Sequence, residues 1–213
     1  MDVLFSEERM DLGRNFMNKL WNSARFILMN MENELPPILN DKNKLKLDST
    51  DQWILSKLNR TMHEVDHAYE KYKINEAIRK VYDFIWADFC DWYIEFAKTR
   101  FYGDDMEDRA IAQSVSVYVM REVLKLLHPY CPFITEELWA HFKTSDEGMM
   151  ISTPWPTADS NMIKDKIVFT HTCLEQCKNI MPNVLRNIIN AKPKLVINFE
   201  VDYDSSPYMV RKY

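Results

Sequence analysis

Two rows of polar, charged and aromatic side chains in this sequence could contact a partner. The first row places one aromatic ring in line with one cation and two amides on a helix of about 3.6 residues per turn: Asn15, Lys19, Asn22 and Phe26. A base stacks on such a ring while amides and a lysine contact its edges or its phosphate. The alternative is a solvated polar helix face with one stray aromatic, and the pattern leaves both open.

The second row lies within an aromatic stretch, Tyr82 to Tyr102, in which nine residues are Phe, Trp or Tyr. It steps by four, three and four: Phe84, Asp88, Asp91 and Glu95. A separate apolar face predicts a core helix: Ile78, Val81, Ile85, Phe89, Trp92 and Phe96. The acidic row is either the solvated side of that helix or a set of polar groups presented to a partner.

Neither a metal site nor a catalytic site is predicted. The acidic row lacks the Glu-x-x-His pair that di-metal helix bundles use, and the four cysteines do not form the paired spacing of a structural zinc site: Cys90, Cys131, Cys173 and Cys177. Three isolated glycines cannot build a phosphate-binding loop or a nucleophile elbow. We therefore expect no cofactor and no enzymatic activity in this chain by itself.

Composition predicts a cytoplasmic protein. No apolar run approaches the roughly 20 residues that span a bilayer, and the amino terminus lacks the pattern of a secretory signal, so membranes are not expected as partners. The net charge of −5 disfavours nucleic-acid binding in general, because nucleic-acid binders usually present a basic surface, and no DNA partner is expected. Residues 161–213 carry eight basic against five acidic residues and are the more plausible phosphate-facing region.

The periodicity predicts a mainly α fold, an antiparallel bundle of about five helices. Its helices are expected at 13–31, at 49–71 with Ser49-Thr50 as the cap, at 74–103, at 104–128 and from Pro132 onward. Residues 145–160 are interpreted as a linker, and Pro182 should interrupt a helical stretch at 161–190 before a strand at 194–201. The predicted domains are 1–156, the bundle, and 157–213, a small helix-plus-strand appendage.

Five segments closely resemble the anticodon-binding domain of valyl-tRNA synthetases, in the order of that family. They are GRNFMNKLWNSARFILMN at 13–30, DQWILSKLNRT at 51–61, the run at 74–98 that contains DFCDWY, LKLLHPYCPFITEELW at 124–139 and MISTPWP at 150–156. Isoleucyl- and leucyl-tRNA synthetases share the bundle, but NKLWN-ARF and DFCDWY look like the valine family. The resemblance weakens after residue 160, where most of the family's arginines are missing.

The resemblance implies recognition of the anticodon stem-loop of a valine tRNA, within an enzyme that joins valine to tRNA. It implies that Phe26 stacks on a base, that Lys19 makes a polar contact and that Ile94-Glu95 lies beside the recognised base. ATP and magnesium would serve catalytic domains joined to this chain in cis, and the chain alone should be inactive. Loop recognition rests on stacking and base edges, so an acidic net charge is compatible with it.

A second hypothesis is a helical protein–protein interaction module, anchored by Trp53, Trp86 and Trp139, because tryptophans are enriched among residues that dominate binding energy. A third is the same domain in an isoleucine or leucine enzyme.

Overall fold

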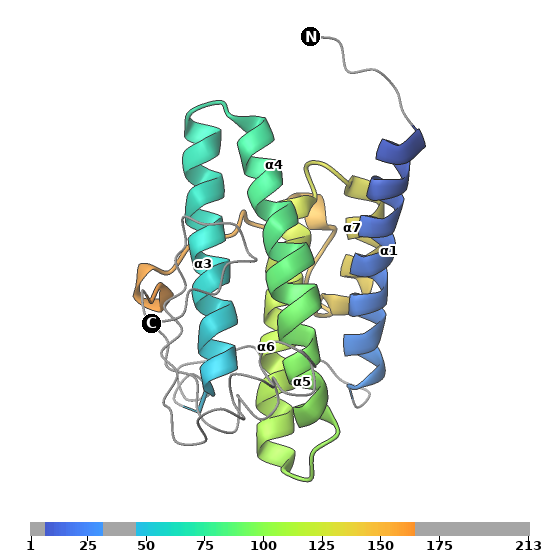
Figure 1. The fold of residues 1–213 in the computed structure, drawn as a ribbon, viewed down its shortest axis with the longest axis vertical. Coiled ribbons are helices and arrows are strands. Elements are labelled where there is room, and N and C mark those ends of the chain that lie inside the picture. Colours follow the sequence, from blue (N-terminus) through green and yellow to red (C-terminus); the bar gives the residue numbers. More distant parts are fainter. Residues whose placement is uncertain (1–6, 32–45, 165–213) are drawn as a thin grey trace, which may run out of the picture.

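The computed structural model describes residues 7–31 and 46–164, and these residues contain helices and turns but no strand (Figure 1). Its long helices are α1 (Glu7–Met29), α3 (Ser49–Glu70), α4 (Ile74–Asp83), α5 (Ile94–Phe101), α6 (Met106–Leu127) and α7 (Pro132–Phe142). A π-helix, η1 (Phe84–Tyr93), joins α4 and α5 without a break. Counted with α4 and α5 as one helix, this part of the chain is the predicted five-helix bundle. The predicted strand at 194–201 lies outside the described residues.

Helices joined by short turns run in opposite directions, but α1 runs parallel to the long central helix (Figure 1). Near the start of α1, the ring of Phe16 lies 4.8 Å from that of Tyr82, centroid to centroid. Near its end, the ring of Phe26 lies 5.7 Å from that of Phe101. Because residue numbers rise together along this contact, the two helices are parallel. This arrangement places the C-terminal end of α1 beside the C-terminal end of α5.

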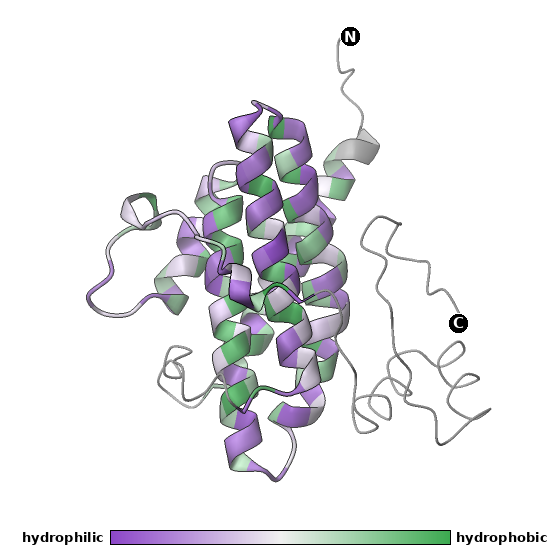
Figure 2. Cartoon of the chain, turned by 90° about the vertical axis from the view of Figure 1, so that its left-hand side faces the viewer, coloured by the Kyte–Doolittle hydropathy of each residue, from purple (hydrophilic) through white to green (hydrophobic). Residues whose placement is uncertain are grey.

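Apolar side chains fill the space between the helices, and Figure 2 shows polar residues along the outward faces. On α1, Phe16, Leu20, Ala24 and Ile27 are all buried and face the core. Two of the tryptophans proposed as anchors for a protein partner also lie in the core: Trp53 is 8% exposed and Trp139 is 0% exposed. That part of the interaction-module hypothesis is wrong, because a buried ring cannot anchor a partner.

The π-helix changes which residues of the central helix reach the core. One row of buried residues advances in steps of four: Ala77, Val81, Ile85, Phe89, Tyr93, Ala97 and Phe101. In an α-helix, a step of four residues overshoots a full turn by about 40°, so such a row would drift around the helix. A π-helix turns less per residue because its hydrogen bonds reach one residue further, so η1 counters this drift over Phe84–Tyr93.

Two predictions that assumed α-helical periodicity are therefore wrong. Trp92, expected in the core, is only partly buried. Phe84, expected in the acidic row, is 2% exposed and belongs to the core.

The N-terminus of α3 is capped by Asp48 rather than by Ser49-Thr50 as predicted. The Asp48 carboxylate accepts hydrogen bonds from the Asp51 backbone N–H and from the Thr50 hydroxyl, each at 2.7 Å. The Asp51 carboxylate in turn accepts from the Asp48 backbone N–H at 3.2 Å, which completes a capping box. A carboxylate one residue earlier satisfies these orphan N–H groups, so Ser49 enters the helix.

Residues 150–164 lie across the bundle instead of leaving it as a free linker. Met150, in the short 3₁₀-helix η2 (Met150–Ser152), is 3% exposed. Beyond the predicted boundary at 156, the Asp159 backbone N–H donates to Asn59 Oδ1 at 2.7 Å. A second 3₁₀-helix, η3 (Ser160–Met162), follows, and the Lys164 backbone N–H donates to Ser56 Oγ at 2.8 Å. Residues on both sides of that boundary therefore contact the bundle.

A buried ionic network joins α3, η1, α5 and α6 at one end of the bundle. The Arg100 side chain, 3% exposed, donates to Asp51 Oδ1 at 2.7 Å and to Asp108 Oδ1 at 2.7 Å. The fully buried Asp51 carboxylate also accepts from the Tyr93 hydroxyl at 2.8 Å. Tyr93 on η1 and Arg100 on α5 both donate to Asp51 on α3. The network therefore fixes the packing of these elements against one another.

Replacing Arg100 with Met should destabilise the fold by about 3–5 kcal/mol, because the Asp51 carboxylate would stay buried without its cation. Urea denaturation measures this loss. Arg79→Met is the matched control: its ion pair with Asp83 is exposed, so its cost should stay within about 0.5 kcal/mol. Equal losses for the two variants would contradict a structural role for the buried pair.

Protonation of Asp51 should make stability depend on pH. Burial raises its pKa from 3.8 to about 6, although Arg100 opposes the shift. A carboxyl whose pKa is higher in the folded protein stabilises it fully below pH 4, and this contribution is lost as the pH rises through 6. The difference in free energy of unfolding between wild type and Asp51→Asn should therefore move in favour of wild type from pH 7 to pH 4. A difference that does not change with pH would contradict this.

Candidate nucleic-acid interface

The second half of α1 meets α5 in a mixed aromatic and charged group, here called the Phe26 cluster: Phe26, Glu95, Lys98 and Phe101. The partly buried Phe26 ring stacks on the Phe101 ring with an interplanar angle of 25°. The Lys98 ammonium lies over the Phe26 ring, 5.5 Å from its centroid. The same ammonium donates to Glu95 Oε1. The structure therefore brings two predicted site residues, Phe26 and Glu95, to one surface through Lys98.

The two predicted amides lie on exposed positions of α1. Asn22 is exposed and precedes Phe26 by one helical turn, and Asn15 is exposed about two turns further away. Residues four apart share a helix face, so Asn22 lies along the same side of α1 as Phe26. Of the two amides, only Asn22 is adjacent to the Phe26 cluster.

Lys19 takes part in a different set of contacts. Its ammonium forms an ion pair with Asp91 and lies 3.8 Å from the centroid of the Trp86 ring. Its side chain is 23% exposed. Attraction to a carboxylate and to an aromatic face holds this cation against η1, so Lys19 connects α1 to the π-helix.

Ile94 was predicted, as part of the pair Ile94-Glu95, to lie beside the recognised base. It is 4% exposed and belongs to the hydrophobic core. Its neighbour Glu95, whose side chain is 38% exposed, faces the surface. In this structure Glu95 is the member of the pair that reaches the surface, and Ile94 anchors the helix beneath it.

Sequence reasoning did not name Lys98 or Phe101 as site residues. Glu95 and Lys98 are three residues apart, a spacing that makes side-chain pairs on a helix, so Lys98 had a local signal. Phe101 had none, since its contact with Phe26 joins positions far apart in the chain.

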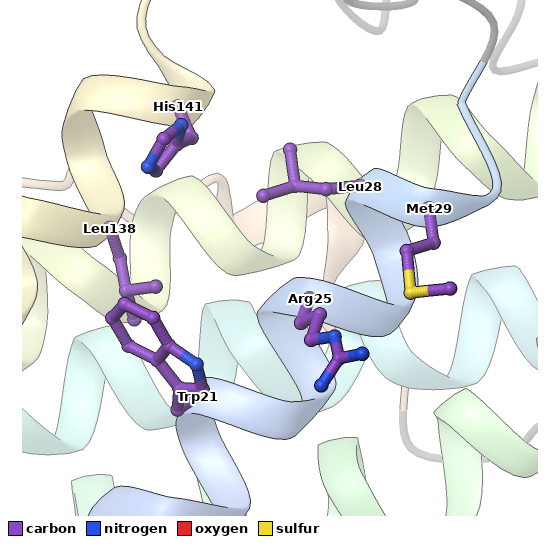
Figure 3. A pocket seen from close by; sticks show the side chains of 6 residues that line it. All are labelled: Trp21, Arg25, Leu28, Met29, Leu138 and His141. Carbon is purple, nitrogen blue, oxygen red and sulfur yellow. The ribbon is translucent and has the colours of Figure 1, made fainter.

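A separate cavity of about 290 Å³ lies between α1 and α7, where Figure 3 shows its lining: Trp21, Arg25, Leu28, Met29, Leu138 and His141. Trp21 precedes Phe26 by five residues, which is roughly 140° around an α-helix. The cavity is therefore lined by Trp21 from another side of α1, but it reaches the neighbourhood of the Phe26 cluster at Met29, which follows Phe26 by three residues.

The described part of the chain offers no group of three or more His, Cys, Asp or Glu side chains that would hold a metal ion. Cys90 and Cys131 are free thiols. Burial raises the pKa of Cys90 to about 11, although the Ser23 hydroxyl donates to its sulfur at 3.2 Å. None of the described helices combines the length and apolarity needed to cross a bilayer.

A family model described as the anticodon-binding domain of tRNA ligase matches residues 51–201. The chain belongs to this family. The match covers α3, η1 and α5, so it includes Glu95, Lys98 and Phe101. It begins after α1, and the parallel contact of α1 with α5 adds Phe26 to the same surface.

Curated valine–tRNA ligases are similar over nearly the whole chain. The protein of Fusobacterium nucleatum is 38% identical over 92% of this chain and 22% of its own length. That of Clostridium perfringens is 40% identical over 90% of this chain and 21% of its own length. That of Latilactobacillus sakei is 38% identical over 98% of this chain and 23% of its own length. The chain thus spans about a fifth of the length of the relatives it matches.

A solved structure shares the fold. The LeuRS chain in the ternary LeuRS–tRNA–LeuAMS complex from Agrobacterium radiobacter K84 superposes with a TM-score of 0.53. The likeness covers 78% of this chain and 19% of that chain, at 17% sequence identity. At this identity the comparison supports the helical bundle alone.

The contacts of Lys19 predict a role in stability. Lys19→Met should lower the free energy of unfolding by about 0.5–2 kcal/mol, because it removes both an ion pair and a cation–π contact. Lys73→Met removes an exposed pair with Glu76 and should cost within about 0.5 kcal/mol. Thermal or urea unfolding compares the two variants, and a Lys19→Met protein as stable as wild type would show that these contacts contribute nothing.

Proposed function

We propose that this chain is the anticodon-binding domain of a valine–tRNA ligase and that it binds the anticodon stem-loop of a valine tRNA. Membership of the anticodon-binding family supports RNA recognition, and similarity to valine–tRNA ligases over nearly the whole chain supports valine as the amino acid. The observation that carries the proposal is the Phe26 cluster, which combines a stacking surface, a cation and a carboxylate on one side of the bundle.

Phe26 is the proposed platform for an unstacked loop base. Its ring is supported from below by Phe101, which is 4% exposed and held in the core. A supported ring loses little conformational freedom when a base stacks on it, and base–aromatic stacking contributes roughly 1–3 kcal/mol per base. Stacking is tolerant of sequence, so it supplies affinity more than discrimination.

Glu95 and Asn22 are the proposed sources of discrimination. A carboxylate accepts hydrogen bonds only, so Glu95 favours a base edge that presents an amino group. An amide both donates and accepts, so Asn22 fits a base edge or the sugar–phosphate backbone. The exposed Asn15 lies further along α1, where it would contact a neighbouring nucleotide.

The chemistry of the whole ligase would take place on domains joined to this chain in cis. ATP and magnesium would bind there, and this chain would contribute recognition of the tRNA. A valine–tRNA ligase uses that recognition to select its tRNA, so we expect no aminoacylation by the chain alone.

The test is a titration of the chain with a valine tRNA anticodon stem-loop, at two salt concentrations, beside a loop altered at its middle base. Native-loop binding should be stronger and should weaken as salt rises. Phe26→Leu, which keeps an apolar side chain but removes the ring, should weaken binding by about tenfold. Phe133→Leu on α7 is the control, since that ring is 91% exposed and lies outside the Phe26 cluster.

Three results would contradict the proposal: no binding of the native loop, equal binding of the altered loop, or the same affinity for Phe26→Leu as for wild type. Stronger binding of an isoleucine or leucine loop would assign the domain to one of those enzymes instead.

A further inference from the structure

Lys98 lies where an incoming base would have to stack. Its ammonium is 5.5 Å from the centroid of the Phe26 ring and 2.5 Å from Glu95 Oε1. In the protein without RNA, one cation thus occupies the two groups assigned above to stacking and to base discrimination. A base that stacks on the ring or binds Glu95 Oε1 would compete with this ammonium for the same group.

Other cations of α1 and α5 have different surroundings. Lys19 is held by Asp91 and the Trp86 ring, with 23% of its side chain exposed. Arg100 is buried in the ionic network. Arg25 lines the cavity between α1 and α7 (Figure 3). Lys98, with 39% of its side chain exposed, combines contact with Phe26 and freedom to move.

We propose that Lys98 is a further tRNA-contact residue, which exchanges its contacts with Phe26 and Glu95 for a phosphate of the bound anticodon loop. This inference rests on the proposed function. The exchange frees the Phe26 ring for stacking and the Glu95 carboxylate for a base amino group. It also brings a positive charge to the anionic loop, which the net-acidic chain must approach.

The energetics permit the exchange. A partly exposed ion pair contributes little to stability, with a median of about 0–1 kcal/mol. A lysine side chain is long and can adopt many rotamers, so its ammonium can move to a nearby phosphate. A hydrogen bond between an ammonium and a phosphate is charge-assisted, and it releases counterions from the RNA. The pair with Glu95 is therefore weak enough to break when a phosphate is offered.

The variant Lys98→Met tests this inference in the same titration, because Met keeps an unbranched apolar side chain and removes the charge. Affinity for the native loop should fall roughly threefold to tenfold, and the slope of log K against log salt should decrease by about one phosphate contact. The loss should be similar for the loop altered at its middle base, since a phosphate contact carries no sequence information. Lys80→Met is the control: Lys80 is an exposed lysine that pairs with Glu64, in the α4 segment of the same long helix.

Glu95→Gln separates the two partners. It should reduce the preference for the native middle base and leave the salt slope unchanged. If Lys98→Met binds the loop with the affinity and salt slope of wild type, the phosphate contact is overturned. Tighter binding by Lys98→Met would also overturn it, because Lys98 would then only obstruct the Phe26 ring. In both cases wild type would still bind the native loop in preference and Phe26→Leu would still be weak, so the proposed function would stand. Loss of that preference in wild type would instead remove the proposed function.

Discussion

The structure depends on the ion pair between Arg100 and Asp51. Taking both charges out of water costs several kcal/mol per ion, and close hydrogen bonds at 2.7 Å offset that cost only in one geometry. Arg100 also reaches Asp108 on α6, so three helices are held at a common end. Phe101 follows Arg100 directly, and the position of that ring determines where Phe26 can stack. A buried electrostatic constraint thus sets the shape of the proposed RNA surface.

The π-helix contributes the second constraint. It keeps Ile85, Phe89 and Tyr93, which are spaced by four, on the buried side of the central helix. The same rotation brings Asp91 to Lys19 on α1 and leaves Glu95 and Lys98 near Phe26. The change from α-helical to π-helical pitch therefore affects both which side chains are buried in the core and where the surface groups lie. π-Helical turns are found frequently at functional sites, and here η1 supplies Tyr93 to the ionic network and Asp91 to Lys19.

Much of the fold could be predicted from the sequence. Apolar residues at helical spacing located five helices, and Pro132 marked the start of the last of them. The cap at Asp48 and the burial of Phe84 could not be predicted in this way. The cap depends on whether Asp48, Ser49 or Thr50 accepts the hydrogen bonds of the first helical turn. The burial of Phe84 depends on the π-helical pitch, whereas a helical wheel assumes a constant α-helical pitch.

The candidate site was predicted in part. The spacing of Phe26 and Asn22 placed both on one side of α1, but it could not show that Lys19 is held by η1 or that Ile94 is buried. These outcomes depend on how α1 packs against α5, and no local pattern encodes the parallel contact between them. The contact of Lys98 with the Phe26 ring could not be predicted for the same reason, because it forms only when α1 packs against α5.

Amide chemical-shift mapping by NMR tests the central claim most directly, namely that the edge between α1 and α5 is the RNA-binding surface. The chain would be titrated with the native valine anticodon stem-loop, with spectra recorded at each step. The account predicts the largest shifts around Asn22–Phe26 and Glu95–Phe101, with small shifts on α7. The largest shifts around Leu138 and His141, beside the cavity between α1 and α7, would contradict it.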